Sequence, residues 1–225
     1  MFNVPFVIVA LIGSFIAIHL IRQVIGPATD EWLILHFAFS PGRFVFLDQF
    51  PGGLPAAVWS FVSHMFLHGS WEHLLLNCVW LLAFGSVVAR RFGPVRFLLF
   101  TFVTGALGAA GNLAAYWGEI SLMIGASGAI SGHMAGAIRL MFSVPGGLSN
   151  MQARSFSHIQ VLSLGQLLRV RAAVIFIGIW LVLNLVFGLS GFGTGGGIGR
   201  VAWEAHLGGF LGGLFLFGLF DRRNA

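Results

Sequence analysis

The chain has few charged residues, no lysine and a single cysteine among its 225 residues. Charged side chains make up 8% of the sequence, against roughly a quarter of a typical soluble domain, which disfavours a soluble enzyme. The lone Cys78 excludes an intrachain disulfide and any multi-cysteine metal site. The 12 basic residues are all arginines and form no basic run, so the net charge of +5 does not indicate a nucleic-acid partner.

Apolar residues dominate the composition instead. Hydrophobic residues make up 57% of the sequence, with 24 Phe and 32 Gly, and the mean hydropathy is +0.92. A soluble fold of this size cannot bury so much apolar surface. The composition therefore predicts an all-α integral membrane protein, with one domain over residues 1–225, whose side chains mostly face lipid or another helix.

Apolar stretches bounded by charges mark the expected membrane crossings, each of which needs about 20 residues. The first stretch has no small-residue cleavage signal, so we expect it to be retained as a helix. The sequence predicts six spans, at residues 4–21, 73–89, 97–118, 120–138, 172–190 and 203–220.

Three segments are expected to lie outside these spans. Residues 49–71 carry no charged side chain but contain prolines, glycines and two histidines. We therefore predict a long loop between the first two spans, partly in the membrane interface. An amphipathic segment at 32–39 precedes it. Residues 141–171 are predicted to form a linker, and the glycine-rich residues 188–199 an outer loop.

The arginines predict the orientation of the bundle. With both termini in the cytoplasm, nine arginines lie inside, whereas Asp221 is the only acidic residue on that side. The linker at 141–171 is then cytoplasmic. The nine are Arg90, Arg91, Arg96, Arg139, Arg154, Arg169, Arg171, Arg222 and Arg223.

Polar residues inside the predicted spans need an explanation, because they are costly in lipid. Ser127 lies in a Gly-Ala-Ser-Gly motif of the fourth span, and His206 lies in the sixth. Glycines at spacing four follow each of them, which lets two helix backbones approach closely: these are Gly128, Gly132 and Gly136 on one span and Gly209 and Gly213 on the other. We therefore predict a hydrogen bond between Ser127 and His206.

Acyl transfer is the chemistry that fits such a pair. A desolvated imidazole stays neutral and can accept the serine proton. Asn77 and His73, four apart on the second span, and the backbone around Ser127 are the expected donors to an oxyanion. No acidic residue lies at spanning depth to orient His206, since Glu204 points to another helix face, so we predict a dyad.

Structural interpretations compete with each of these assignments. A serine among glycines is more often a packing residue than a nucleophile, and a lone membrane histidine is as often structural as functional. His64, His68 and His73 could indicate a metal, but their spacing and the lack of an intramembrane carboxylate disfavour one. The remaining histidines are taken as interfacial or structural: His19, His36, His133 and His158.

The three motifs, in this order, resemble the rhomboid family of intramembrane serine proteases. The matching stretches are His64 to Asn77, Gly125 to Gly128, and Ala205 to Gly213. The resemblance implies a six-helix rhomboid-like bundle with Ser127 as nucleophile and His206 as general base. An oxyanion site of His73, Asn77 and the Ser127 backbone is also implied, with His68 in a polar region nearby. Single-span membrane proteins are the implied substrates, without cofactor or metal.

Two positions depart from the family pattern. The family often has Arg after the tryptophan of the first outer loop, where this chain has Trp59-Ser60, and a Tyr four residues after the nucleophile, where it has Ser131. These departures motivate an alternative, a catalytically idle rhomboid-like protein that binds membrane helices. A transporter or channel is a third alternative, which the lack of an internal repeat disfavours. We expect a bacterial inner membrane as the location, with an organellar membrane as the alternative.

Overall fold

The computed structural model describes residues 4–144, 159–190 and 201–221. These residues are mainly helical, with one isolated antiparallel bridge between Phe39 and Met123. The long helices are α1 (Phe6–Val24), α4 (Trp71–Trp80) continued through a π-helical turn (Leu81–Gly85) into α5 (Ser86–Phe92), α6 (Pro94–Ala115), α7 (Ser127–Met141), α10 (Arg171–Ser190) and α11 (Trp203–Phe220). The short ones are α2 (Pro27–Phe37), α3 (Gly53–Ser63), α9 (Leu164–Leu167) and three 3-10 turns (Pro41–Phe44, Leu47–Gln49, His64–Phe66).

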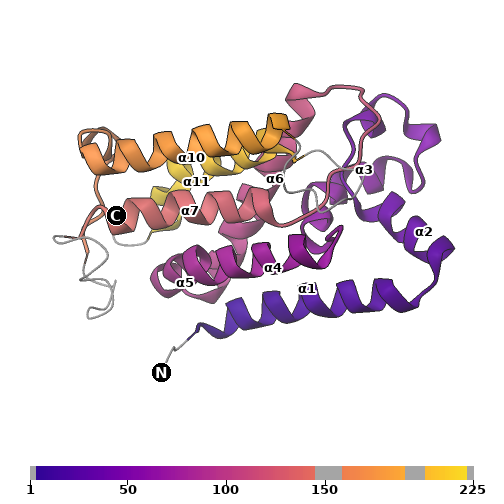
Figure 1. The fold of residues 1–225 in the computed structure, drawn as a ribbon, viewed down its shortest axis with the longest axis horizontal. Helices are drawn as coiled ribbons and strands as arrows, with labels where there is room; N and C mark the ends of the chain where they lie inside the picture. Colours follow the sequence, from indigo (N-terminus) through magenta and orange to yellow (C-terminus); the bar gives the residue numbers. More distant parts are fainter. Residues whose placement is uncertain (1–3, 145–158, 191–200, 222–225) are drawn as a thin grey trace.

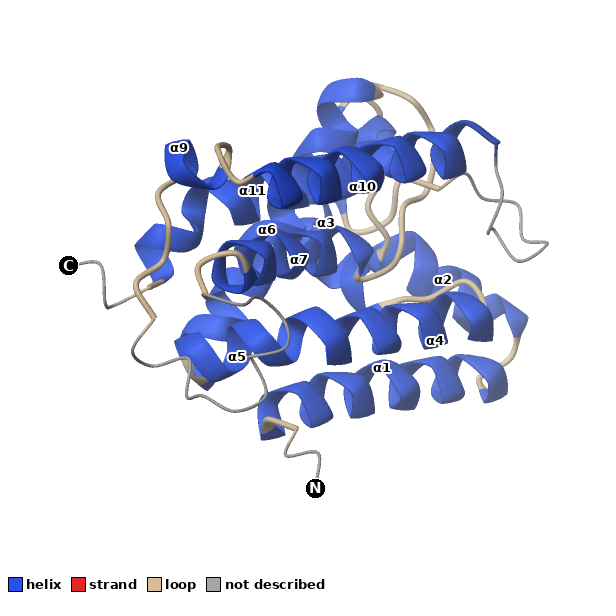
Figure 2. Ribbon diagram, turned by 60° about the vertical axis from the view of Figure 1, so that its left-hand side comes forward, coloured by secondary structure: helices blue, strands red, loops and turns tan. Residues whose placement is uncertain are grey.

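The long helices form a bundle with α7 at its centre. Figures 1 and 2 show α1 on one side, α4 and α5 next to it, and α10 with α11 on the opposite side of α7. Among the described residues, five helices are long and apolar enough to cross a membrane: α1, α4 with α5, α6, α10 and α11. The all-helical bundle with apolar helices is the architecture that the composition predicted.

Helix α7 differs from the predicted span at 120–138, because it begins only at Ser127. Gly125 has φ +113°, which an α-helix cannot contain. Its N–H donates to the carbonyl of His64 (2.9 Å), and Met123 pairs with Phe39, so the segment before the helix is fixed in an extended form. The 15 residues of α7 are nearly all buried, which explains how a helix too short to count as a membrane span lies inside the bundle.

The region between the first two long helices also differs from the predicted loop at 49–71. Two helices, α2 and α3, and three 3-10 turns fill it. Gly52 with φ +81° precedes α3, and Ser70 caps α4 by accepting a hydrogen bond from the backbone N–H of His73 (3.2 Å). Buried Arg43 links α2 to the segment before α3, because its guanidinium donates to the carbonyls of Leu35 and Pro51 (2.5 and 2.8 Å).

Two predicted connections lie only partly within the described residues. Residues 145–158 of the predicted linker at 141–171, which include His158 and Arg154, lie outside the described residues, as do residues 191–199 of the predicted outer loop. The described end of the linker contains α9, which starts with a capping box in which Ser163 and Gln166 bond to each other's backbone N–H.

Candidate active site

Ser127 and His206 are joined by a hydrogen bond across the centre of the bundle. Ser127 is the first residue of α7, and its Oγ lies 2.7 Å from Nε2 of His206 on α11. Ser127 is half-buried, as is His206, so the pair lies inside the protein yet is not sealed from outside. A serine hydroxyl bonded to an imidazole nitrogen is the arrangement that activates serine as a nucleophile.

Glycines allow this approach of α7 and α11. Gly209 lies against Gly128, and Gly213 lies against Gly132, so closely that a Cβ atom on either residue of α11 would overlap a backbone carbonyl of α7. Helix α11 also meets α6 without intervening side chains, because a Cβ on Gly108 would lie 2.8 Å from the carbonyl oxygen of Ala205. The small faces recognised in the sequence are therefore the faces that meet.

The other ring nitrogen of His206 bonds to Asn184 on α10. The Nδ1 of His206 lies 2.7 Å from Oδ1 of Asn184, and the amide nitrogen of Asn184 donates to the carbonyl of Trp203 (3.1 Å). A search for acidic side chains as hydrogen-bond partners of His206 misses this asparagine. Asn184 is the only amide in the strongly apolar stretch 172–190, and a search for polar residues in each span would have found it.

His73 and Asn77 lie on α4 beside the turn that leads to Ser127. The amide nitrogen of Asn77 donates to the carbonyl of His73 (2.9 Å). Gly125 separates both side chains from the start of α7: a Cβ atom there would lie 2.6 Å from Nε2 of His73 and 3.9 Å from Nδ2 of Asn77. The structure thus brings both residues to the segment preceding Ser127.

The other two histidines of the first motif lie outside the spans and are buried. Nδ1 of His64 donates to the carbonyl of Ser60 (2.8 Å), and burial lowers the pKa of His64 to about 4. Burial, followed by the neighbouring His73 and other basic groups, lowers the pKa of His68 to about 3. Both are therefore neutral at pH 7. Within the described ranges no group of three His, Cys, Asp or Glu side chains is arranged to hold a metal.

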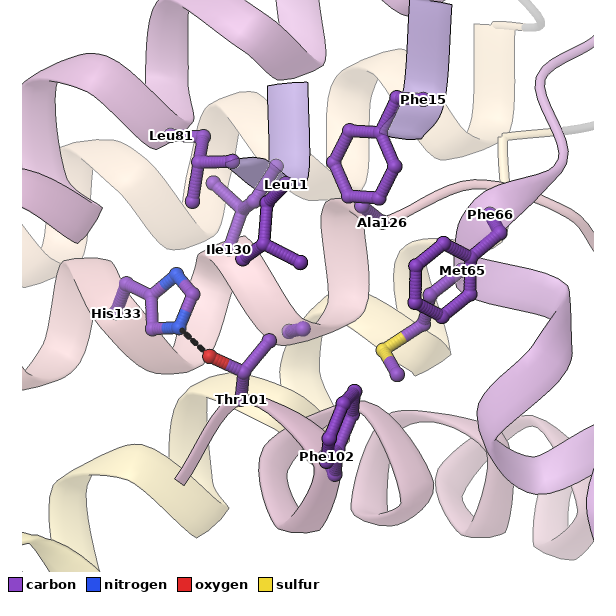
Figure 3. Close-up of a pocket in the computed structure, with 11 residues that line it drawn as sticks. Leu11, Phe15, Met65, Phe66, Leu81, Thr101, Phe102, Ala126, Ile130 and His133 are labelled. Atoms are coloured by element: carbon purple, nitrogen blue, oxygen red, sulfur yellow. Dashed lines mark hydrogen bonds between the residues drawn. The ribbon is translucent and has the colours of Figure 1, made fainter. Parts of the chain in front are cut away.

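A small cavity lies next to α7, and neither Ser127 nor His206 lines it. Figure 3 shows apolar side chains around it, among them Leu11, Phe15 and Met65. Thr101 donates its hydroxyl hydrogen to the carbonyl of Phe97, so the Nε2–H of His133 donates to Thr101 Oγ1 (2.8 Å). These bonds satisfy Thr101 and one nitrogen of His133, which suits a structural role for this histidine.

Comparison with known proteins decides the family. The model of the Rhomboid domain matches residues 55–223, three quarters of the chain, and that range contains all four predicted site residues. The chain belongs to the rhomboid family. It is therefore an integral membrane protein, in agreement with its apolar helices.

Curated rhomboid proteins match over shorter stretches. The rhomboid protease GlpG of Haemophilus influenzae is 38% identical over 50 residues, 22% of this chain and 26% of that protein. GlpG of Yersinia pestis is 36% identical over 76 residues (33% of this chain, 24% of that protein), and RHOMBOID-like protein 4 of Arabidopsis thaliana is 34% identical over 84 residues (37% and 21%). The matched stretches thus span about a quarter of these relatives' length.

The two departures from the rhomboid pattern have visible structural consequences. Ser131 donates its hydroxyl to the backbone carbonyl of Ser127 (2.8 Å), so this hydroxyl is engaged within α7. Ser60 likewise donates to the carbonyl of Ala57 (2.9 Å), within α3. Glu204 faces α6, where it accepts a hydrogen bond from the hydroxyl of Tyr116, so it lies on a different face from His206, as the sequence predicted.

Proposed function

We propose that this rhomboid protein is an intramembrane serine protease that acts through Ser127 and His206. The observation that carries the proposal is the 2.7 Å contact between Ser127 Oγ and His206 Nε2. The Rhomboid domain match and the rhomboid proteases among the relatives support it. The contact also supplies the activated nucleophile that a serine protease needs. The departures at Ser60 and Ser131 leave this contact in place.

The reaction follows from the polarity of that contact. Ser127 Oγ attacks the carbonyl carbon of the scissile peptide bond while its proton passes to His206 Nε2. The tetrahedral intermediate then collapses as the C–N bond breaks, and the imidazolium returns the proton to the leaving nitrogen. Water, deprotonated by the same imidazole, hydrolyses the acyl-enzyme and restores the serine. Every proton taken by His206 is thus given back within one cycle.

His73, Asn77 and the backbone N–H of Ser127 are the proposed oxyanion donors. Their support is the position of both α4 side chains beside Gly125, two residues before the nucleophile. Asn77 donates to the carbonyl of its own helix in the structure, so a short side-chain rotation toward the substrate is part of the proposal. A donor of this kind is typically worth about 2.7 to 4 kcal/mol of activation free energy.

Membrane-spanning segments of single-span proteins are the proposed substrates. The apolar exterior of the bundle supports this class: α10, for example, exposes large apolar side chains such as Ile179, Val182 and Val186. We propose a multi-pass arrangement of six spans in a bacterial inner membrane, with both termini and the 141–171 linker in the cytoplasm. The arginine distribution supports this orientation.

A fluorophosphonate probe tests the enzyme assignment on the purified full chain in detergent. We expect covalent labelling that is lost in Ser127→Ala and in His206→Ala. Ser131→Ala is the matched control, because it removes a hydroxyl one turn along the same helix and should still be labelled. Absence of labelling in folded protein between pH 6 and 9 would favour the idle helix-binding alternative. Labelling that survives Ser127→Ala would overturn the assignment.

The substrate class needs a separate test in cells. Membrane-protein fragments should be compared between cells with the native protein and cells with Ser127→Ala. Fragments that end within or beside a spanning segment, and that require Ser127, are the expected result. Fragments confined to soluble proteins would contradict the proposed substrate class while leaving the nucleophile intact.

A further inference from the structure

Asn184 occupies a position on α10 that its neighbours make informative. The buried residues of this helix are Ala173, Asn184 and Gly188, whereas most of its other side chains are exposed. Gly188 lies against Trp203, where a Cβ atom would approach the indole to 2.5 Å. An asparagine is thus the polar member of the narrow face by which α10 meets α11.

The orientation of the Asn184 amide is determined by its two partners. The carbonyl oxygen of Trp203 can only accept a hydrogen bond, so the amide nitrogen of Asn184 faces it (3.1 Å). The amide oxygen therefore faces Nδ1 of His206 at 2.7 Å, and it can only accept. Nδ1 of His206 must consequently carry the hydrogen, which leaves Nε2 of the neutral ring as the acceptor for the hydroxyl of Ser127 (2.7 Å).

We propose that Asn184 is a positioning residue that, with the Trp203 carbonyl, holds His206 in the tautomer and orientation needed to deprotonate Ser127. Ser127, His206 and Asn184 then act in series, and α10 supplies the third member. This inference rests on the proposed protease function. Asn184 touches neither the nucleophile nor a reacting atom, so its effect passes through the imidazole.

The structure gives this role to Asn184 because the other candidates are engaged elsewhere. Ser131, one turn after the nucleophile, donates to the carbonyl of Ser127. Glu204 accepts from Tyr116 on the far face of α11. The ring of Phe210, one turn after His206 on α11, stacks on Trp180 with centroids 4.3 Å apart. Among the described residues, Asn184 forms the hydrogen bond to Nδ1 of His206, the ring nitrogen that does not face Ser127.

The loss of the acceptor has two distinct consequences. Without it the imidazole can carry its hydrogen on Nε2, the wrong nitrogen, and it can rotate, which lowers the rate of nucleophilic attack. A misplaced catalytic group can cost about 10²-fold. The hydrogen bond from Nδ1 also strengthens when the ring becomes a cation. Removal of the acceptor therefore destabilises the cation, and activity should appear at lower pH.

The test measures fluorophosphonate labelling rates of the purified full chain in detergent between pH 5 and 9. Asn184→Leu keeps the approximate volume and removes both hydrogen bonds, whereas Asn184→Asp keeps an acceptor for Nδ1. We expect the limiting rate of Asn184→Leu to fall about 10²-fold, with unchanged apparent affinity for the probe and a pH profile displaced to lower pH. Asn184→Asp should label faster than Asn184→Leu, with its profile at or above the wild-type position.

Val186→Ala is the matched control, because it truncates an exposed side chain of the same helix and should leave rate and profile unchanged. If Asn184→Leu does not fold, Asn184→Ala replaces it in the same comparison. A wild-type rate and profile in the acceptor-free variant would overturn the proposal. So would equal slowing by the acceptor-free and Asp variants with unshifted profiles, since that indicates only a packing role. Failure to label the wild type, or labelling of Ser127→Ala, would instead refute the protease function.

Discussion

Gly209 on α11 lies directly on Gly128 of α7, at a place where no side chain of any size fits between the two backbones. Gly128 follows Ser127, and Gly209 lies three residues after His206, one turn along the helix. The separation of the two helices at this contact therefore fixes the separation of the serine and the imidazole. The glycines do not touch a substrate, yet the Ser127–His206 hydrogen bond depends on them.

Gly209→Ala should therefore destabilise the bundle. Its Cβ would overlap the Gly128 carbonyl, and the backbone of α7 cannot move away without losing its own packing. We expect a loss of more than about 3 kcal/mol, at or beyond the upper end for overpacking, visible as a lower melting temperature in detergent. Gly218→Ala on the same helix is the control, since its Cβ would meet nothing within 4 Å. Equal stability of the two variants would contradict the close contact.

Asn77→Ala should keep the fold and slow the reaction. The substitution removes one hydrogen bond to the helix backbone, worth about 1 kcal/mol, and a donor to the developing oxyanion, worth up to about 10² to 10³ in rate. The measurement is the limiting rate of fluorophosphonate labelling, set beside the melting temperature. Leu76→Ala removes the preceding, exposed side chain and should label normally. An unchanged rate in Asn77→Ala would remove this residue from the oxyanion role.

The sequence predicts those features of the site that depend on residues close together in the chain, and it misses those that depend on distant residues. Glycine spacing on two spans and polar residues in lipid are local signals, and they predicted the contact of Ser127 with His206 and the helix faces that meet. The start of α7 is not local: Gly125 adopts its positive φ while its N–H bonds to the carbonyl of His64, far back in the chain. A charge-bounded apolar window cannot reveal such a pairing, so the span was placed too early.

The region between α1 and α4 and the partner of His206 show the same limit. Prolines and glycines argued against a regular crossing at 49–71, but the short helices of this region depend on tertiary contacts such as the bonds from Arg43 to the carbonyls of Leu35 and Pro51. A search for carboxylates alone as hydrogen-bond partners of an imidazole overlooks Asn184. An amide carbonyl also accepts from Nδ1, and it does so without placing a charge in the membrane.

Acid should destabilise the protein through His64. Burial lowers the pKa of His64 to about 4 from its ordinary value of 6.5. Between these values the unfolded chain binds a proton that the folded protein does not, so stability falls as pH decreases from about 6.5 to about 4 and is insensitive to this group above 6.5. The contribution is roughly 1.4 kcal/mol for each pH unit in that window.

Melting temperatures in detergent at pH 7.5 and pH 5 measure this effect. His64→Gln keeps a donor for the Ser60 carbonyl and cannot titrate, so the difference between the two pH values should shrink in this variant. The buried His68, whose pKa is also lowered, contributes with the same sign and keeps some dependence. His36→Gln on α2, a less buried histidine, is the control. An undiminished difference in His64→Gln would contradict the assignment.

Arg91 and Asp221 should be strongly coupled in stability. Arg91, at the end of α5, donates from Nε and Nη2 to the two carboxylate oxygens of Asp221 (2.9 and 2.8 Å), just after α11. The side chains are 0% and 2% exposed, so neither charge is well solvated. Removal of one partner takes the opposite charge away from the other in a buried place, which typically costs about 3 to 5 kcal/mol.

A double-mutant cycle separates pairing from packing at this contact. We expect Arg91→Met and Asp221→Asn each to lower the melting temperature in detergent markedly. The double variant should lose much less than the sum of the two, because neither buried charge is then present. Additive losses would mean that the two side chains stabilise the protein independently. Helix α5 continues α4, which carries His73 and Asn77, and Asp221 follows α11, which carries His206. The Arg91–Asp221 pair therefore joins these two helices at the end opposite the site. Its loss should therefore also reduce the rate of fluorophosphonate labelling at temperatures well below the melting transition.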